Sequence, residues 1–249
     1  MPERTIPNLQ RAVERHRRAG TLHHAPTFAG LAPSSLRYGT ARPAATSPTT
    51  AVVDLPHACP ERVAEFLAGR AAAQAAIAQL DRPRTAETTL PIGPNRAPRW
   101  PADVAGSITH CAGLALAVAS LRNALTAVGV DAEPDEPLPP GLAPLILTPR
   151  EQSRYPRLTT SRLAFSAKEA FYKCWSSAGG EFLEFLDVDL WLGPHPHQFS
   201  ISAPDGNRWP GAYTIHHQRI LTLCWPPPPS QNRDTQNLRQ QTGPPKENT

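Results

Sequence analysis

The spacing of hydrophobic and polar positions along the 249-residue chain changes several times. Between residues 59 and 80, in "CPERVAEFLAGRAAAQAAIAQL", apolar residues recur at helical spacing, and Pro60 suits the first position of a helix. Between 106 and 133 the apolar runs "GSITHC", "LALAVAS" and "LTAVGVDAE" are short and typical of strands. We expect these runs to form adjacent strands, with a turn at residues 122–124 joining the second pair.

The second half of the chain repeats this order of elements. "TPREQSRY" predicts a helix start, because Thr148 and Glu151 have the spacing of a capping box. A long helix is predicted over 158–177. From 185 to 225 the runs "FLDVDLWL", "HQFSIS", "GAYTIHH" and "RILTLCW" are typical of an antiparallel meander. Helix, strands, helix, strands predicts an α+β fold rather than α/β.

Proline-rich stretches interrupt these elements. The 30 prolines are about 12% of the chain, against an average usage of about 5%. They cluster in segments that we interpret as loops, and the polar segment after Trp225 is expected to be disordered. The resulting division is residues 1–58 as an N-terminal extension or the start of the first half, 59–125 as the first half, 126–225 as the second half and 226–249 as a tail.

Composition excludes some classes of protein and favours others. The net charge of +4 is mild and the basic residues form no long run, so nucleic-acid binding is weakly supported. The four cysteines are far apart without metal-ligand spacing, which favours reduced thiols and a cytoplasmic protein. The longest apolar run, "GLALAVASL", is too short to cross a membrane, and we expect no signal peptide.

Two of the three lysines lie in one stretch, "FSAKEAFYKCW", at residues 165–175. Glu169 and Lys173 are four residues apart and share a helix face. Taken alone, this spacing is explained by an exposed ion pair on the helix surface. Lys168 falls inside the apolar arc of the same helix. An ammonium group in that position is costly unless it finds an anion.

Two further carboxylates follow the apolar run that ends at Val130. Asp131 and Glu133 would point to the same face of a strand, about 7 Å apart, where they could converge on a hard cation. The alternative is a strand that ends in an acidic turn, "DAEPDE". Taken together, D-x-E on a strand and K-E-x-x-x-K on a helix indicate a Mg²⁺ site beside a phosphate.

Three of these segments resemble the signature motifs of one enzyme family. "GSITHC", "VGVDAEP" and "LAFSAKEAFYKCW" are similar to motifs of the 4′-phosphopantetheinyl transferases of the monomeric surfactin/enterobactin type, and "RAPRWP" fits the enterobactin-synthase and actinobacterial branch. The resemblance covers about half of the chain. It implies two similar halves related by a pseudo-twofold axis, each with a long helix packed on a small antiparallel sheet, and coenzyme A between them.

The resemblance also implies a reaction and its residues. The 4′-phosphopantetheine arm of coenzyme A would move to a serine of an apo carrier protein and leave 3′,5′-ADP. Asp131, Glu133 and Glu169 would hold Mg²⁺, and Glu169 would take the serine proton directly or through water. Lys173 would stabilise charge on the breaking pyrophosphate, with Lys168 helping at the same phosphates.

Coenzyme A contacts are expected in the first half. His110, with Thr109 beside it, resembles the contact to the 3′-phosphate, although a packed histidine at a strand end would look alike. Arg62 and Arg70 resemble residues that clamp the adenine nucleotide, with a solvated helix face as the alternative. Further candidates are the adenine-covering loop residues and a side chain along the pantetheine arm, which are Gly93, Asn95, Arg96 and Phe182.

Two other functions compete with the transferase reading. A metal-dependent nuclease also uses an aspartate with E-x-K, but on a strand and with a basic surface. A relative that binds coenzyme A or carrier proteins without turnover would keep the fold and lose the acids. The sequence leaves open whether the carrier serves fatty-acid, polyketide or nonribosomal-peptide synthesis. We expect a cytoplasmic monomer that binds neither nucleic acid nor membranes.

Overall fold

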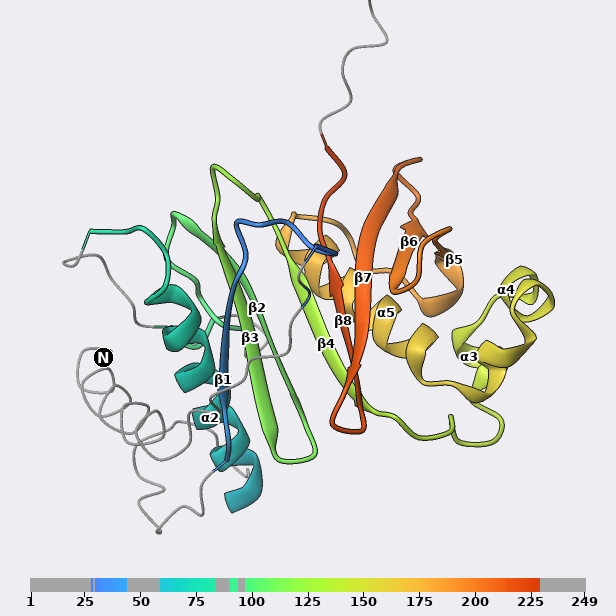
Figure 1. Cartoon of the computed structure of the whole chain (residues 1–249), viewed down its shortest axis with the longest axis horizontal. Coiled ribbons are helices and arrows are strands. Elements are labelled where there is room, and N and C mark those ends of the chain that lie inside the picture. Colours follow the sequence, from blue (N-terminus) through green and yellow to red (C-terminus); the bar gives the residue numbers. More distant parts are fainter. Residues whose placement is uncertain (1–27, 29, 44–58, 84–89, 94–96, 229–249) are drawn as a thin grey trace, which may run out of the picture.

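The computed structural model describes residues 28, 30–43, 59–83, 90–93 and 97–228 (Figure 1). Every strand pair in this part of the chain is antiparallel. Helices and antiparallel sheets confirm the α+β class. The predicted disorder of the tail falls almost wholly outside the described residues.

A three-stranded sheet forms the first half. Its strands β1 (Arg37–Ala41), β3 (Leu114–Leu121) and β2 (Val104–Cys111) lie in the order β1-β3-β2. Helix α2 (Pro60–Ile77) packs on this sheet through a cluster of buried alanines and larger apolar side chains. Proline stands at the start of α2, as the sequence predicts.

A five-stranded sheet forms the second half. In spatial order its strands are β4 (Gly129–Pro134), β8 (Arg219–Cys224), β7 (Arg208–His216), β6 (Gln198–Ser202) and β5 (Asp189–Leu192). Strands β5 to β8 form the predicted meander. The strand β4 comes earlier in the chain and closes the sheet by pairing with β8.

Helices cover the second sheet. The long helix α5 (Leu163–Ser177) packs on it through the largest buried cluster. Between β4 and α5 the chain forms α3 (Ala143–Ile146), α4 (Pro149–Arg154) and the 3₁₀ helix η3 (Pro156–Thr160), and a second 3₁₀ helix, η4 (Phe185–Asp187), follows α5. At the start of α4 the predicted capping box of Thr148 and Glu151 is present.

The two sheets meet between the two long helices (Figure 1). A third buried cluster joins them, with Leu116 and Val118 from β3 and Val130 and Ala132 from β4. The alternation along β4 therefore turns Val130 and Ala132 toward the first sheet and leaves the intervening residues facing α5. The molecule thus holds its polar β4 residues between a strand and a helix.

One strand glycine in each half touches the long helix of that half. A Cβ on Gly39 of β1 would lie 1.9 Å from the carbonyl oxygen of Ala72 in α2, and a Cβ on Gly129 of β4 would lie 1.8 Å from that of Ala170 in α5. These distances leave no room for a side chain. Only glycine allows the strand backbone to approach the helix backbone so closely.

Three sequence predictions need correction. The long helix starts at Leu163 rather than at 158, because η3 precedes it and the Ser161 hydroxyl accepts a hydrogen bond from the Leu163 amide, 3.1 Å away. Strand β1 lies within a segment predicted to be loop; it is short, and its pairing with β3 fixes it. Finally, β3 and β4 do not pair, since they belong to different sheets.

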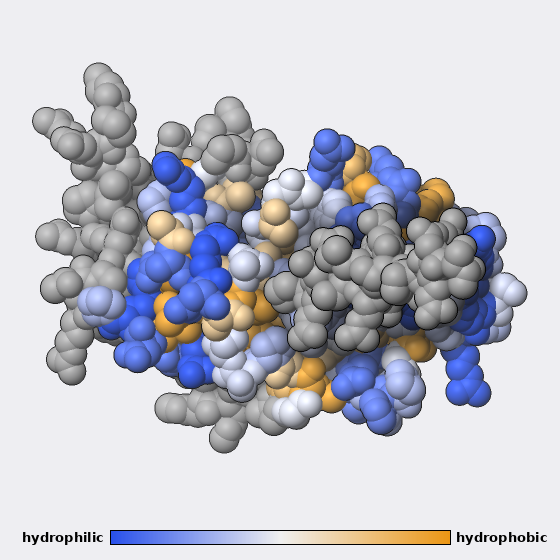
Figure 2. Space-filling model, turned by 90° about the horizontal axis from the view of Figure 1, so that it is seen from above, coloured by the Kyte–Doolittle hydropathy of each residue, from blue (hydrophilic) through white to orange (hydrophobic). Residues whose placement is uncertain are grey.

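The described helices include none that is long and apolar enough to span a membrane. Seen from above, apolar and polar side chains are interspersed on the visible surface (Figure 2). All four cysteines are unpaired thiols; Cys59 is exposed, and Cys111, Cys174 and Cys224 are buried.

The glycine contact between β4 and α5 makes a first prediction. Gly129→Ala should destabilise the protein by at least about 3 kcal/mol, because the new methyl group meets helix backbone that cannot move aside. Gly206→Ala is the control: its site has open space, and only its positive φ of 78° opposes alanine, at about 1 kcal/mol. Urea unfolding measures both, and similar small losses would contradict the contact.

Candidate active site

The polar face of β4 lies against α5. Gly129, Asp131 and Glu133 alternate along the strand, and each meets a residue in or next to α5: Gly129 meets Ala170, Asp131 bonds to Ser166 and Lys173, and Glu133 pairs with Arg162. The two carboxylates therefore share one face, as the D-x-E spacing predicts. Their partners are arranged along successive turns of the helix.

Asp131 is the centre of a buried hydrogen-bond network. The Lys173 ammonium donates to its Oδ1 at 2.6 Å, the Ser166 hydroxyl to its Oδ2 at 2.9 Å, and the Thr109 hydroxyl to Oδ1 at 3.3 Å. These donors come from α5 and from β2. The network thus fixes the carboxylate at the place where the first sheet meets the second half.

The second carboxylate, Glu133, is half-buried. The Arg162 guanidinium, at the start of α5, donates to its Oε2 at 3.2 Å and lies 3.7 Å from Glu136. Burial raises the pKa of Glu133, and the charge of Asp131 raises it further, while Arg162 and then Lys173 oppose this. A second cation near this carboxylate would therefore be favourable.

Glu169, in α5, is near enough to both carboxylates for their charges to affect its pKa. Burial is the main reason that its pKa is raised, and the negative charges of Asp131 and Glu133 add to the effect, while Lys173 opposes it. All three acids thus influence one another electrostatically. A carboxylate whose pKa is raised is a stronger base than an ordinary glutamate.

These oxygen donors fit a hard divalent cation in kind. Burial is the main cause of the raised pKa of Glu133 and Glu169, and the repulsion from the neighbouring acids that adds to it is what such a cation would relieve. Within the described residues, however, no group of three or more His, Cys, Asp or Glu side chains is arranged to hold a metal. Lys173 pairs with Asp131, and Arg162 pairs with Glu133. A bound metal would share the carboxylate oxygens with these two cations or displace the cations from them.

Lys168 has a different position from the one expected. Its side chain is 0% exposed, and its ammonium donates to Glu151 at 2.8 Å and to the carbonyl oxygens of Ile146, Phe185 and Val188. The predicted contact of Lys168 with phosphates is therefore replaced by contacts within the protein. The helical pattern correctly required an anion, and that anion is Glu151.

Glu151 connects three elements through this pair. Its carboxylate accepts hydrogen bonds from the Thr148 amide at the start of α4, from Lys168 in α5 and from the Leu190 amide in β5. Glu151, which belongs to the capping box at the start of α4, therefore also fixes α5 through its contact with Lys168. The spacing of Thr148 and Glu151 in the sequence predicts the capping box, but it does not predict that Glu151 pairs with Lys168.

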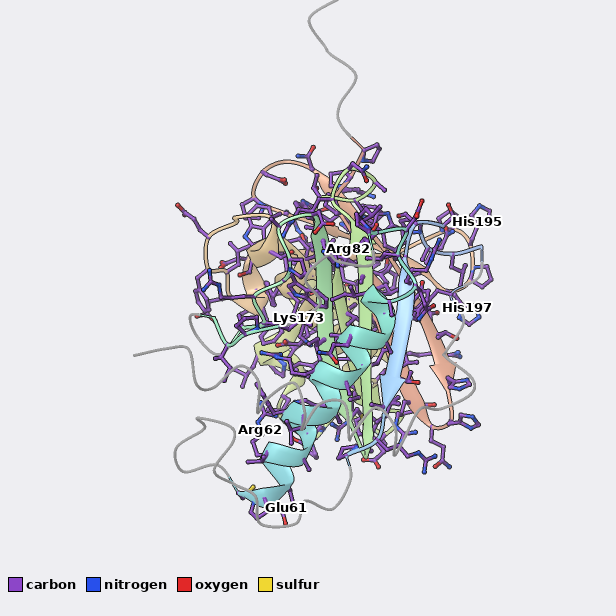
Figure 3. All side chains as sticks on the ribbon, turned by 90° about the vertical axis from the view of Figure 1, so that its left-hand side faces the viewer. Glu61, Arg62, Arg82, Lys173, His195 and His197 are labelled. Atoms are coloured by element: carbon purple, nitrogen blue, oxygen red, sulfur yellow. The ribbon has the colours of Figure 1, made fainter. Side chains whose placement is uncertain are left out.

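On the first half, α2 and β2 bring two predicted residues together. The guanidinium of Arg62 lies 2.6 Å from Nε2 of His110, and it also pairs with Glu65 at 3.1 Å. Figure 3 shows Arg62 near the start of α2. Thr109 and His110 are neighbours on β2 and point to opposite faces, so Thr109 meets Asp131 in β4 whereas His110 meets Arg62 in α2.

Arg70 lies deeper in the same half. Its side chain is buried, it donates to the Leu90 carbonyl at 3.1 Å, and its guanidinium stacks 4.5 Å from the Phe66 ring. Burial lowers the pKa of Arg70 to about 10. Its Nη2 has no hydrogen-bond acceptor among the described residues. Arg62 is thus exposed to solvent, whereas Arg70 is buried and has one N–H donor, Nη2, without an acceptor among the described residues.

For the two remaining candidates that the structure describes, Gly93 and Phe182, no contact with the acidic network is found. Gly93 donates its amide to the Ala97 carbonyl at 2.8 Å, which closes a tight turn. Asn95 and Arg96 fall outside the described residues. The side chain of Phe182 is 86% exposed.

Sequence reasoning passed over several residues of this network. Ser166 and Thr222 are fully buried, and their hydroxyls lie 2.9 Å apart beneath Asp131. Thr222 faces Asp131 across the β4–β8 pair, a register that the sequence pattern does not give. Arg162 could have been suspected because it directly precedes the predicted helix motif.

Comparison with known proteins agrees with this arrangement. Residues 50–120 match the model of the 4′-phosphopantetheinyl transferase N-terminal domain, and residues 127–224 match the 4′-phosphopantetheinyl transferase superfamily. The 4′-phosphopantetheinyl transferase PptT of Mycobacterium tuberculosis is 36% identical over 174 residues, 66% of this chain and 69% of that protein. The chain belongs to the 4′-phosphopantetheinyl transferases.

Two further relatives are similar to this chain over comparable lengths. The transferase Svp of Streptomyces mobaraensis is 36% identical over 152 residues, 57% of this chain and 60% of that protein. Enterobactin synthase component D of Escherichia coli is 39% identical over 180 residues, 68% of this chain and 80% of that protein. The chain thus spans somewhat less than two thirds of the Streptomyces relative.

The two family matches divide the site between them. Arg62, Thr109 and His110 belong to the N-terminal transferase segment, whereas Asp131 and Lys173 belong to the superfamily segment. The hydrogen bond between Thr109 and Asp131 therefore joins the two.

The buried pair makes the next prediction. Lys168→Met should destabilise the protein by about 3–5 kcal/mol, because it leaves the Glu151 carboxylate charged and buried without its cation. Arg150→Met, in the exposed part of α4, should change stability by less than about 0.5 kcal/mol. Chemical unfolding at pH 7 compares the two; equal stabilities would show that Lys168 does not neutralise Glu151.

Proposed function

We propose that this protein transfers the 4′-phosphopantetheine group of coenzyme A to a serine of an apo carrier protein, with Mg²⁺, and releases 3′,5′-ADP. The observation that carries the proposal is the meeting of Asp131, Glu133, Glu169 and Lys173 between β4 and α5 in a chain of this family. The relatives named above as 4′-phosphopantetheinyl transferases support the reaction class.

Asp131, Glu133 and Glu169 are the residues that would hold Mg²⁺. When bound, the ion would neutralise the coenzyme A pyrophosphate and stabilise the charge that develops on it as the bond to phosphopantetheine breaks. Ser166 and Thr109 hold Asp131 in place by their hydrogen bonds, which keeps its oxygens directed toward the junction.

Glu169 is the proposed general base. Its raised pKa strengthens its affinity for the proton of the acceptor serine, which it would take directly or through water. Lys173 lies 2.6 Å from Asp131 and would stabilise, as a mobile point charge, the negative charge that develops on the 3′,5′-ADP leaving group as the pyrophosphate bond breaks. An ammonium on a flexible stem can exchange an aspartate oxygen for a phosphate oxygen with little rearrangement.

The nucleotide end of coenzyme A would bind the first half. Arg62 and His110 already form a basic pair for the 3′-phosphate, with Thr109 next to them. The unused Nη2 of Arg70 supports a role of this side chain toward the adenine nucleotide. The resemblance implies that one loop covers the adenine and that one side chain lines the pantetheine arm. The proposal includes these roles for Gly93, Asn95 and Arg96 in the loop and for Phe182 along the arm.

The proposed architecture is a pair of similar halves related by a pseudo-twofold axis, at residues 59–125 and 126–225. Three observations support it. Each half orders strand, long helix and a final hairpin; in each sheet the last strand pairs with the first; and Gly39 and Gly129 touch their helices alike. Strand β1, within residues 1–58, also belongs to the first half because it pairs with β3, whereas the tail is proposed to lie outside both halves.

The partners of this reaction would be coenzyme A and an apo acyl or peptidyl carrier protein. We propose a cytoplasmic monomer. The competing function is binding of these partners without turnover. The presence of the acids and of Lys173 favours catalysis. The experiment below separates the two.

Intact-protein mass spectrometry of an apo acyl carrier protein incubated with this protein, coenzyme A and Mg²⁺ tests the proposal. We expect a mass gain of one phosphopantetheinyl group that is lost with EDTA. Glu133→Ala should reduce the rate at least about 100-fold, because a site without this carboxylate holds Mg²⁺ poorly. Glu136→Ala, an exposed acid nearby, is the matched control and should keep most of the rate.

No mass gain on acyl or peptidyl carriers, with coenzyme A binding intact, would support the relative that binds without turnover. An undiminished rate in Glu133→Ala would contradict the role of this carboxylate.

The raised carboxyl pKa values predict the pH dependence of transfer. Glu133 and Glu169 must be ionised, and both protonate at higher pH than an ordinary glutamate at 4.5. The value of kcat/KM for coenzyme A should therefore fall as pH decreases, with a midpoint above 4.5. Arg162→Leu removes the cation that lowers the pKa of Glu133, so the midpoint should rise further. A midpoint at or below 4.5 would contradict this.

A further inference from the structure

Two buried hydroxyl groups lead away from Asp131 into the second half of the protein. Thr222 of β8 is the cross-strand partner of Asp131 in β4, and its side chain is 0% exposed. Its hydroxyl lies 2.9 Å from the hydroxyl of Ser166 in α5 and 2.8 Å from the Ser166 carbonyl oxygen. Ser166 is also 0% exposed, and its hydroxyl lies 2.9 Å from Oδ2 of Asp131. We call the side chains of Ser166 and Thr222 the hydroxyl pair.

The number of available protons fixes the direction of these hydrogen bonds. An ionised carboxylate can only accept, so the single hydroxyl proton of Ser166 goes to Oδ2 of Asp131. The hydroxyl oxygen of Ser166 is then left as an acceptor toward Thr222. The hydroxyl proton of Thr222 can go to this oxygen or to the Ser166 carbonyl oxygen. Both acceptors of the Thr222 hydroxyl thus lie on Ser166.

The two oxygens of Asp131 differ as a result. Oδ2 accepts from the Ser166 hydroxyl, which Thr222 holds in turn, and both of these side chains are fully buried. Oδ1 accepts from the ammonium of Lys173 at 2.6 Å and from the Thr109 hydroxyl at 3.3 Å. The side chain of Lys173 is 31% exposed. Oδ1 is therefore the oxygen at which a cation from solution can compete with an ammonium group.

Burial means that Thr222 can affect the reaction only through its neighbours. Hydrogen bonds in a buried chain polarise one another, so removing the first donor weakens the next bond. In metal sites, residues that orient the ligands typically change metal affinity or activity about 10- to 100-fold when they are replaced. Thr222 has the position of such a residue, because it orients Ser166 and Ser166 donates to the carboxylate.

We propose that Thr222 is a positioning residue of the cation site: its hydroxyl holds Ser166, which keeps Oδ2 of Asp131 fixed and leaves Oδ1 for Mg²⁺. The inference rests on the proposed function, since it concerns a carboxylate to which that function assigns the ion. The alternative is a purely structural role of the hydroxyl pair, which connects α5 to β8. In the first case metal affinity follows the Thr222 hydroxyl, and in the second it follows the packing of the side chain.

The test compares Thr222→Val, which removes the hydroxyl and keeps the branched shape, with Thr222→Ser, which keeps the hydroxyl. Mn²⁺ replaces Mg²⁺ as the probe, and its electron paramagnetic resonance signal gives the Kd in the presence of coenzyme A without any transfer. We expect the Kd for Mn²⁺ to rise about 10-fold in Thr222→Val and to stay within about 3-fold of the wild-type value in Thr222→Ser. Thr40→Val changes a buried threonine of β1, at the far edge of the first sheet, and should leave the Kd unchanged.

In the transfer assay, the Mg²⁺ concentration that gives half of the maximal rate should rise as the Kd does. An unchanged Kd in Thr222→Val overturns the proposal, and so does a wild-type protein that binds no Mn²⁺. An equal rise of the Kd in Thr222→Ser or in Thr40→Val also overturns it, since packing or stability would then explain the loss. If the wild type binds Mn²⁺ but modifies no carrier, the proposed function fails, and the positioning role is decided by the Kd of Thr222→Val alone.

Discussion

The contact of β4 with α5 at Gly129 is the constraint on which the active site depends. Without a side chain on this residue, the strand backbone touches the helix backbone near Ala170. The next residues of the same strand face, Asp131 and Glu133, then fall opposite the turns of α5 that carry Lys173 and Arg162. One close contact between backbones thus brings carboxylates and cations together that are far apart in the sequence.

The two lysines of α5 serve separate purposes. Lys168 is enclosed by one carboxylate and three carbonyl oxygens, which a compact ammonium can satisfy and a planar guanidinium cannot. Lys173 is partly exposed and shares its contacts with Asp131 and Val130. Of the three lysines in a chain that otherwise uses arginine, Lys168 neutralises a buried carboxylate, and the role that we propose for Lys173 is in the reaction.

Local sequence patterns predicted much of this structure, but they did not predict which segments far apart in the sequence pair with each other. The D-x-E spacing, the capping box of Thr148 and the meander all follow from local rules, and the structure contains them. Strand β1 was missed because its neighbour β3 lies over seventy residues away in the chain. The same limit applies to Glu151, whose pairing with Lys168 depends on how α4 and α5 pack rather than on their sequences.

The central claim is that the acids between β4 and α5 form a cation site used together with coenzyme A. Isothermal titration calorimetry of coenzyme A, with and without Mg²⁺, tests it most directly in the wild-type protein and in Asp131→Asn. We predict that Mg²⁺ tightens coenzyme A binding at least about 10-fold in the wild type, or roughly 1.4 kcal/mol, and has little effect in Asp131→Asn. An equal effect of Mg²⁺ in both proteins, or none in the wild type, would contradict the account.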